Sequence, residues 1–250
     1  MFDTLRNAQG EALESDLHGY LTPGCELAVI GHGVTGNKDR AWAVELAATL
    51  AASGIPTLRF SFSGNGGSEG EFADSCPTKE VGDLNAVLEA AVQDGRRPIT
   101  YIGHSMGAAV GVLAAHQNAR ITRLVSLAGM VHTADFYKAK FSKQRVGKTV
   151  MWDKPECPLS ATFRDDMNAI GSVLPLASKL SQPWLLVHGT EDTVVPDSES
   201  IEVMRAARGT AELVRLGGVD HVFSGEGTAQ MCEAVLRYLT RSWCGATQRV

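Results

Sequence analysis

The regular alternation of short apolar runs with longer stretches of helical periodicity constrains the fold of this chain more than any other feature. Six runs of five or six residues have the composition of strands that are covered on both faces. These runs are residues 27–31, 57–62, 99–103, 123–128, 184–188 and 211–216. Strands that alternate with helical stretches are typical of a sheet whose parallel strands are joined by crossover connections.

The stretches between these runs have the spacing of amphipathic helices. Residues 40–52 place Trp42, Leu46 and Leu50 along one face, and residues 81–92 repeat the pattern. Three further helices are predicted at 106–116, 198–207 and 229–243. Right-handed crossovers place helices on both faces of a sheet, so we predict an α/β fold with a doubly wound, mostly parallel sheet. The first twenty residues predict an antiparallel hairpin that turns near Gln9 and Gly10 at a sheet edge.

The stretch 130–182 interrupts this alternation. It contains helical fragments broken by Pro155, Pro158 and Pro175, and no clear strand. Since a connection of about a dozen residues would join the flanking parallel strands, the remainder is an insertion. Insertions of this length commonly form lids or small subdomains over a site. We therefore predict one domain over residues 1–250, with a small cap inserted at residues 130–182.

Composition and charge exclude several classes of function. A net charge of −5 argues against the clustered basic surface that nucleic acid requires, so we expect no nucleic-acid partner. No apolar run approaches the roughly 18 residues of a membrane span, and the first ten residues lack the apolar stretch of a secretory signal. We therefore expect a cytoplasmic protein without a membrane partner. The dispersed cysteines predict free thiols and no metal site; they are Cys25, Cys76, Cys157, Cys232 and Cys244.

A candidate nucleophile follows the predicted strand 99–103. The sequence Gly103-His104-Ser105-Met106-Gly107 leads directly into an alanine-rich helix. A G-x-S-x-G pattern between a strand and a helix is typical of a nucleophile elbow, a sharp turn that exposes a serine hydroxyl. Its glycines let the strand and the helix pass closely, and the helix N-terminus adds partial positive charge near a developing oxyanion. The alternative interpretation is that Ser105 only caps the helix.

A serine hydroxyl needs a base to remove its proton and an acid to orient that base. Among the downstream histidines, His221 is the best candidate base, because it follows the last predicted strand in a glycine-containing loop that can carry its imidazole over the sheet edge. The acid should leave the preceding strand, where Glu191 and Asp192 both follow residues 184–188. A plainer interpretation as solvated loop charges is open for Glu191, Asp197 and Asp220.

Two backbone N–H groups are needed to stabilise the oxyanion of an acyl-transfer reaction. One should be the N–H of Met106, directly after the serine. The other should come from the loop at residues 31–36, whose glycines let the backbone approach a substrate, and we assign it to Val34. A role for His32 as a structural residue that hydrogen-bonds within this loop is simpler than a catalytic one.

These motifs together resemble the α/β-hydrolase superfamily over residues 27–243. The matching residues are Gly31-His32-Gly33, the run 64–70, the elbow at 103–107, His188-Gly189 with Asp192 and Pro196, and Asp220-His221. The sequence H-G-x-T-G-N-K-D at residues 32–39 and the insertion after Ala128 resemble bacterial cinnamoyl/feruloyl esterase-type serine hydrolases. This chain departs from many relatives in the run 60–64, where it has two serines in place of a charged residue. The contacts that this loop makes in those relatives therefore do not carry over directly, whereas the triad is unaffected.

The resemblance implies a catalytic triad of Ser105, Asp192 and His221, with the N–H groups of Val34 and Met106 as the oxyanion hole. It also implies hydrolysis of short or aromatic acyl esters without a cofactor, and a small cap that shapes the substrate pockets. Aromatic side chains commonly line such pockets. The candidate substrate contacts are His32, Phe136, Tyr137 and Trp152.

We therefore predict a carboxylic ester hydrolase that acts on a small-molecule ester through an acyl-enzyme, as a monomer or homodimer. A thioesterase or a small-substrate peptidase would use the same triad, and a non-catalytic ligand-binding protein on the same fold is a third interpretation. A basic cluster in the insertion is either a solvated face or a field that attracts anionic esters; it comprises Lys138, Lys140, Lys143, Arg145 and Lys148.

Overall fold

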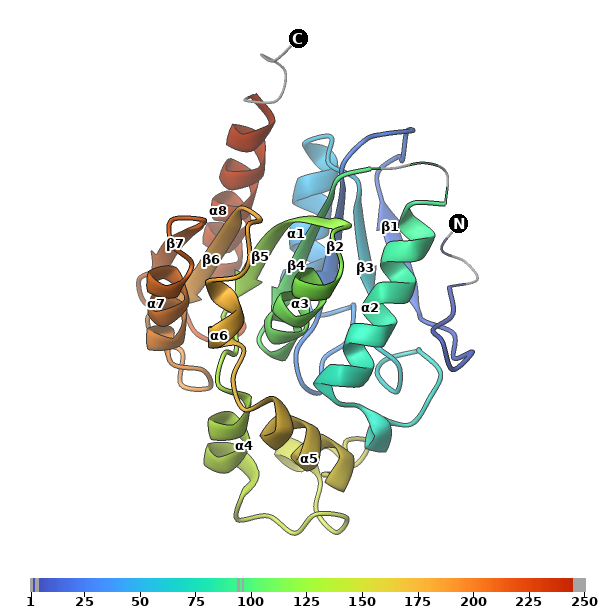
Figure 1. Ribbon diagram of the computed structural model, residues 1–250, viewed down its shortest axis with the longest axis vertical. Helices are drawn as coiled ribbons and strands as arrows, with labels where there is room; N and C mark the ends of the chain where they lie inside the picture. The colour runs from blue at the N-terminus through green and yellow to red at the C-terminus, as the bar shows by residue number, and fades with distance from the viewer. Residues whose placement is uncertain (1, 3–4, 94, 96, 245–250) are drawn as a thin grey trace.

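The computed structural model describes residues 2, 5–93, 95 and 97–244. Its centre is a seven-stranded sheet in the order β1-β3-β2-β4-β5-β6-β7 (Figure 1). The strands are β1 (Ser15–His18), β2 (Leu27–Gly31), β3 (Thr57–Phe60), β4 (Ile99–His104), β5 (Ile121–Leu127), β6 (Trp184–Gly189) and β7 (Ala211–Leu216). β1 is antiparallel to β3, and the other neighbouring pairs are parallel, which confirms the predicted mostly parallel sheet.

All six strands predicted from the sequence are present, some with different ends. β3 ends at Phe60 and not at residue 62, because its last paired residue is Phe60, opposite Ser15 of β1. β5 begins two residues earlier than predicted, because Ile121 pairs with Ile99 of β4. β2, β3, β4 and β6 are buried along their whole length, which explains the continuous apolar runs in the sequence.

Helices cover both faces of the sheet, as a doubly wound fold requires. The helices of one face are α1 (Ala41–Ala52) and α8 (Glu226–Cys244), and those of the other are α2 (Pro77–Ala91), α3 (Met106–Gln117) and α7 (Asp197–Ala206). Residues of β2 alternate between the two cores: Leu27 and Val29 join one cluster, and Ala28 and Ile30 the other. Trp42 enters the second cluster from α1, as its helical spacing predicts.

The predicted N-terminal hairpin is present only in part. The chain turns at residues 8–9, and a single antiparallel bridge joins Arg6 to Ala12. The Asn7 side chain takes the place of a longer ladder, since its Oδ1 accepts the N–H groups of Gln9 and Glu11. Within the same predicted stretch, β1 forms an antiparallel edge of the sheet, as expected. Residues 1, 3 and 4 of the prediction lie outside the described residues.

The inserted segment, residues 130–182, forms short helices beyond the carboxyl ends of the strands (Figure 1). They are α4 (Thr133–Phe141), the 3₁₀ turn η2 (Met151–Asp153), α5 (Ala161–Ile170) and α6 (Leu174–Ala177); a further turn, η1 (Phe72–Asp74), precedes α2. Phe136, Phe141 and Phe163 form an apolar cluster with Met106 and Val195 of the body, which fastens the segment over the sheet edge. α6 packs against α3 and α7 instead.

Two further observations concern the predictions about membrane spans and cysteines. Within the described ranges, no helix is long and apolar enough to cross a bilayer. Four cysteines carry free thiols, namely Cys25, Cys76, Cys157 and Cys232. The side chain of Cys244 lies outside the described residues.

Candidate active site

The predicted nucleophile, base and oxyanion residues gather at the carboxyl edge of the sheet. A cavity of about 160 Å³ lies there between the body and the inserted segment. Its wall includes the loop after β2 (residues 33–36), Ser105, His221 with Val222, and the aromatic side chains of Phe136 and Trp152. Parallel α/β sheets place their sites at this edge because the loops that follow the strands converge there.

Ser105 occupies the sharp turn that the sequence pattern predicts. Its backbone has φ 53° and ψ −118°, a strained conformation for a residue with a Cβ atom. A Cβ atom on Gly103 would collide with the carbonyl of Gly107, and one on Gly107 would collide with the carbonyl of His32. The side chain of Ser105 makes no capping hydrogen bond to α3, so the alternative interpretation as a helix cap is not supported.

Asp192 and His221 are joined by a short hydrogen bond. His221 Nδ1 lies 2.7 Å from Asp192 Oδ2, while Asp192 Oδ1 accepts the N–H groups of Val194 and Val195 at 2.8 and 2.9 Å. Burial raises the pKa of Asp192, but hydrogen bonds from His188 and His221 outweigh burial and lower it well below its usual range. The carboxylate is therefore ionised at neutral pH and holds the hydrogen of His221 on Nδ1, which leaves Nε2 as the basic nitrogen.

A second histidine contacts the same carboxylate, which sequence reasoning missed. His188 Nε2 lies 3.1 Å from Asp192 Oδ2 and 3.0 Å from the carbonyl of Val195, two groups that can only accept. His188 therefore donates from Nε2, and Nδ1 accepts from the hydroxyl of Ser200 at 2.7 Å. The sequence signal was the four-residue spacing of His188 and Asp192 across the end of β6.

The loop that carries His221 is held by the residue before the nucleophile. His104 Nε2 donates to the carbonyl of His221 at 2.8 Å, and the two rings lie 4.8 Å apart. Trp42 packs on the other side of His104, with a ring separation of 4.9 Å. Burial, with the nearby charge of His221, lowers the pKa of His104 to about 3, so His104 is a neutral donor at physiological pH.

The loop after β2 lies directly against the nucleophile. A Cβ atom on Gly33 would come within 2.7 Å of the Ser105 Cβ, so only glycine permits this approach. The N–H groups of Val34 and Met106 make no hydrogen bond with another residue of the described chain, and Val34 lines the cavity. Free N–H groups beside the serine are what an oxyanion hole requires.

His32 has the structural role that its loop position suggested. Its Nδ1 donates to the carbonyl of Gly33 at 2.9 Å, and its Nε2 accepts the N–H of Phe62 at 3.0 Å. Burial lowers its pKa to about 4, so the ring is neutral. His32 is not among the residues that line the cavity, and the structure does not support it as a substrate contact.

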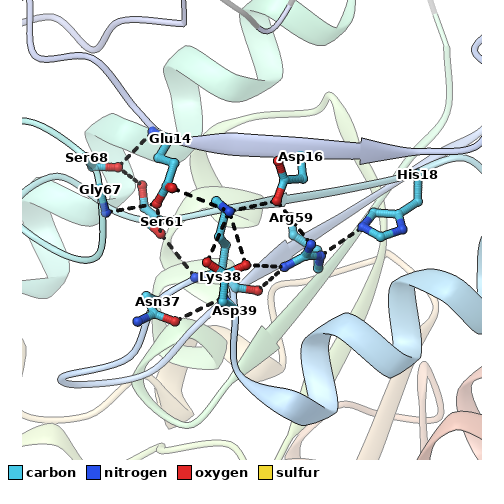
Figure 2. Close-up of polar contacts among 10 residues, drawn as sticks. All are labelled: Glu14, Asp16, His18, Asn37, Lys38, Asp39, Arg59, Ser61, Gly67 and Ser68. Carbon is cyan, nitrogen blue, oxygen red and sulfur yellow. Dashed lines mark hydrogen bonds and ion pairs between the residues drawn. The ribbon is translucent and has the colours of Figure 1, made fainter.

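An ion-pair network fixes the same loop to the sheet (Figure 2). Lys38 Nζ lies 2.7 Å from Asp16 and 3.1 Å from Asp39, and Arg59 pairs with both carboxylates. Burial lowers the pKa of Lys38, but hydrogen bonds to Asp16 and Asp39 outweigh it and raise the pKa. Ser61 Oγ accepts the N–H of Lys38, so one of the two unexpected serines holds the loop in place.

The remaining predicted residues are divided between the cavity and other parts of the structure. Phe136 and Trp152 line the cavity, whereas Tyr137 is buried against Phe163 within the inserted segment. The sequence did not predict five of the lining residues, namely Thr35, Arg40, His104, Val194 and Val222, and it assigned Trp42 to the helix core alone.

Two other carboxylates of these loops, Asp197 and Asp220, have partners away from the catalytic residues. Asp197 forms an ion pair with Arg215, and Asp220 accepts the N–H of Ser224. Asp192 is the only one of the candidate acids that contacts His221 among the described residues.

Comparison with solved structures finds the same fold in several proteins. Est1E from Butyrivibrio proteoclasticus has a TM-score of 0.80 and 23% identity, over 96% of this chain and 98% of that chain. Est1E with ferulic acid bound gives 0.79 and 25%, over 94% and 97%. The monoacylglycerol lipase of Paleococcus ferrophilus gives 0.71 and 17%, over 91% and 98%. No curated protein matches the sequence.

These similarities confirm the predicted α/β-hydrolase fold. The family model described as "Serine aminopeptidase, S33" matches residues 25–162, more than half of the chain. The matched range includes the loop after β2, the nucleophile elbow and most of the inserted segment. The chain therefore belongs to the serine aminopeptidase S33 family of α/β serine hydrolases.

Proposed function

We propose that this protein hydrolyses small carboxylic esters with short or aromatic acyl groups through an acyl-enzyme on Ser105. The observation that carries the proposal is the 2.7 Å hydrogen bond between Asp192 and His221 beside a cavity that both His221 and Ser105 line. This arrangement supplies a nucleophile, a base and an orienting acid in one place.

The proposed reaction has two halves, acylation of Ser105 and then deacylation, and the same residues act in both. The Ser105 hydroxyl oxygen attacks the ester carbonyl while His221 Nε2 takes its proton, and the N–H groups of Val34 and Met106 stabilise the oxyanion. The C–O bond of the ester breaks, and His221 returns the proton to the leaving alkoxide. Water then attacks the acyl-serine while His221 Nε2 takes its proton. The bond between the acyl carbon and the Ser105 oxygen breaks, His221 returns the proton to that oxygen, and the acid is released.

The size and polarity of the cavity support a small ester. A volume of about 160 Å³ is small for a ligand pocket, which favours a short acyl chain or one aromatic ring. Phe136, Trp152, Val194 and Val222 provide apolar wall for such a group. The binding of ferulic acid by the similar structure of Est1E is consistent with an aromatic acyl group.

The charge of the cavity favours an ester over a peptide with a free amino terminus. An aminopeptidase must bind a cationic ammonium group, for which a carboxylate is the natural partner. Among the described residues, none of those that line the cavity carries a carboxylate, and the charged group present is the guanidinium of Arg40. A thioester of coenzyme A remains the second candidate, because the basic residues of the inserted segment suit an anionic leaving group.

The test is hydrolysis of p-nitrophenyl esters from acetate to decanoate, of methyl ferulate and of an acyl-coenzyme A. We expect the highest kcat/KM for the short and aromatic esters, and a fall of about 10⁴-fold or more in kcat for Ser105→Ala. Ser181→Ala, which changes an exposed serine before β6, is the matched control and should leave turnover unchanged. Activity in Ser105→Ala, or acyl-coenzyme A as the preferred substrate, would contradict the proposal.

A further inference from the structure

Arg40 presents a positive charge to the cavity, and no acidic residue of the described chain forms an ion pair with it. The residue precedes α1 and lines the same cavity as Ser105 and His221. Its Nη2 donates to the carbonyl of Thr35 at 2.8 Å, and no ion pair joins it to a carboxylate of the described chain. The nearby cations Lys38 and Arg59 differ, because each pairs with Asp16 and Asp39 (Figure 2).

A second cation reaches the same carbonyl from the inserted segment. Lys154 Nζ donates to the carbonyl oxygen of Thr35 at 3.1 Å, so two positive charges converge on one neutral acceptor. Like charges this close repel each other, and an anion between or beside them would offset that repulsion. Thr35 follows Val34, which places both cations next to the proposed oxyanion hole.

The space beside these cations is open to a ligand. A second cavity, of about 440 Å³, shares Thr35, Gly36 and Arg40 with the first and has Lys154 in its wall. Two carboxylates also line it, but Asp39 is engaged by Lys38 and Arg59, and Glu156 is exposed to solvent. A substrate group that extends from the first cavity into the second would therefore meet Arg40 and Lys154, two cations that no ion pair joins to a carboxylate of the described chain.

The start of α1 adds to this charge. Arg40 is the N-cap residue, its side chain makes no capping hydrogen bond, and the first turn contains no acidic residue. The N-terminus of a 12-residue helix carries a partial positive charge that favours a nearby anion. Trp42, in the first turn of this helix, lines the catalytic cavity.

We propose that the ester substrate carries a carboxylate, which Arg40 binds with Lys154 beside it. This inference rests on the proposed ester hydrolysis and names its substrate class. A guanidinium is planar and pairs with a carboxylate through two parallel N–H donors, and Nη2 alone is engaged at Thr35. The carboxylate would lie on the second-cavity side of Thr35, while the ester carbonyl lies at Ser105.

The test compares matched esters in which a carboxylate is replaced by a neutral group. One pair carries the charge on the acyl side: mono-p-nitrophenyl glutarate and p-nitrophenyl valerate. The other carries it on the leaving group: 4-acetoxybenzoate and 4-acetoxybenzamide. The readout is the ratio of kcat/KM for the charged ester to that for the neutral ester, measured for wild type and each variant.

We expect Arg40→Gln to lower this ratio by about 10- to 100-fold for at least one pair, which is the loss typical of a hydrogen bond to a charged group. Arg40→Lys keeps the charge without the planar fork and should retain part of the ratio. Lys154→Gln should lower the ratio by a smaller factor. Arg120→Gln removes an equal charge from an exposed position near the amino ends of the strands and should leave the ratio unchanged.

Two outcomes separate this inference from the proposed function. An unchanged ratio for both pairs in Arg40→Gln and Lys154→Gln, with neutral turnover that still depends on Ser105, overturns the carboxylate site alone. Absence of Ser105-dependent turnover for either neutral ester contradicts the proposed hydrolysis itself. If Arg40→Gln does not fold, as judged by thermal unfolding, Arg40→Lys and Lys154→Gln decide the question.

Discussion

His188 donates a hydrogen bond to the same oxygen of Asp192 that binds His221. Asp192 Oδ2 thus accepts from two imidazoles, and Oδ1 accepts two backbone N–H groups. Since the carboxylate is fully buried, these four donors are what keep it ionised and fixed in orientation. His188 has no place in the cavity, so it acts on the reaction only through the position of Asp192.

We expect His188→Gln to lower kcat by about 10-fold with little change in KM, because Asp192 loses a well-placed donor. The pH profile of kcat/KM should shift as well, since the environment of His221 changes with its partner. Ser200→Ala removes only the donor to His188 Nδ1 and should have a smaller effect on kcat. A loss of thermal stability with unchanged kcat and an unchanged pH profile would show that His188 is only structural.

We expect Asp192→Asn to lower kcat by about 10⁴-fold, as in other serine triads, because an amide cannot hold His221 in the required tautomer. Glu191→Gln is the matched control, since Glu191 lies in the same loop and makes no side-chain contact with His221. Steady-state kinetics with a short p-nitrophenyl ester measures both. Near-normal turnover in Asp192→Asn, or a comparable loss in Glu191→Gln, would contradict the assignment of the acid.

Stability should fall between about pH 6.5 and pH 4, because two buried histidines are neutral in the folded protein. Burial lowers the pKa of His32 to about 4, and burial with the charge of His221 lowers that of His104 to about 3. In the unfolded chain these two histidines take up protons below about pH 6.5, whereas in the folded protein they stay neutral until the pH approaches their lowered pKa values. The free energy of unfolding therefore drops by up to about 1.4 kcal/mol per pH unit for each histidine.

Urea unfolding across this pH range measures the slope. His32→Gln preserves an acceptor for the N–H of Phe62 and removes one titrating group. The free energy of unfolding should therefore depend less steeply on pH, by the contribution of one proton. An equal slope in wild type and His32→Gln would contradict the assignment of a neutral buried His32.

The network around Lys38 should contribute to both stability and catalysis. Arg59→Leu removes one of the two cations that pair with Asp16 and Asp39, which stay about half exposed, so we expect a loss of about 1–3 kcal/mol in the free energy of unfolding. We also expect kcat/KM to fall, because the loop that carries Val34 loses an anchor. Arg237→Leu breaks an exposed pair with Glu233 and should change stability by less than about 1 kcal/mol. Equal effects of the two variants would contradict the network's role.

The sheet could be predicted from the sequence because its signal is local. Buried parallel strands such as β2 and β6 are continuous apolar runs, and α8 buries residues at helical spacing, including Met231, Val235 and Leu239. The elbow at Ser105 was recognisable because strand, turn and helix are consecutive in the chain. The choice of Asp192 over Glu191 came from family resemblance, since the direction of adjacent side chains in a loop depends on its turns.

Contacts between distant segments could not be predicted in the same way. Lys38 meets Asp16 only because β1 returns beside β3, and Arg40 faces the cavity only because the loop before α1 turns at Thr35, which has a positive φ of 55°. The interior position of Tyr137, next to the cavity residue Phe136, depends on how α4 packs against α5. Sequence periodicity does not contain this information.

The most direct test of the central claim is rapid-quench mass spectrometry of the protein mixed with p-nitrophenyl acetate. We expect a transient mass increase of one acetyl group in wild type, located to the peptide that contains Ser105, and none in Ser105→Ala. An acetyl group on another residue, or steady turnover without an adduct on Ser105 even when deacylation is slowed at low pH, would contradict it.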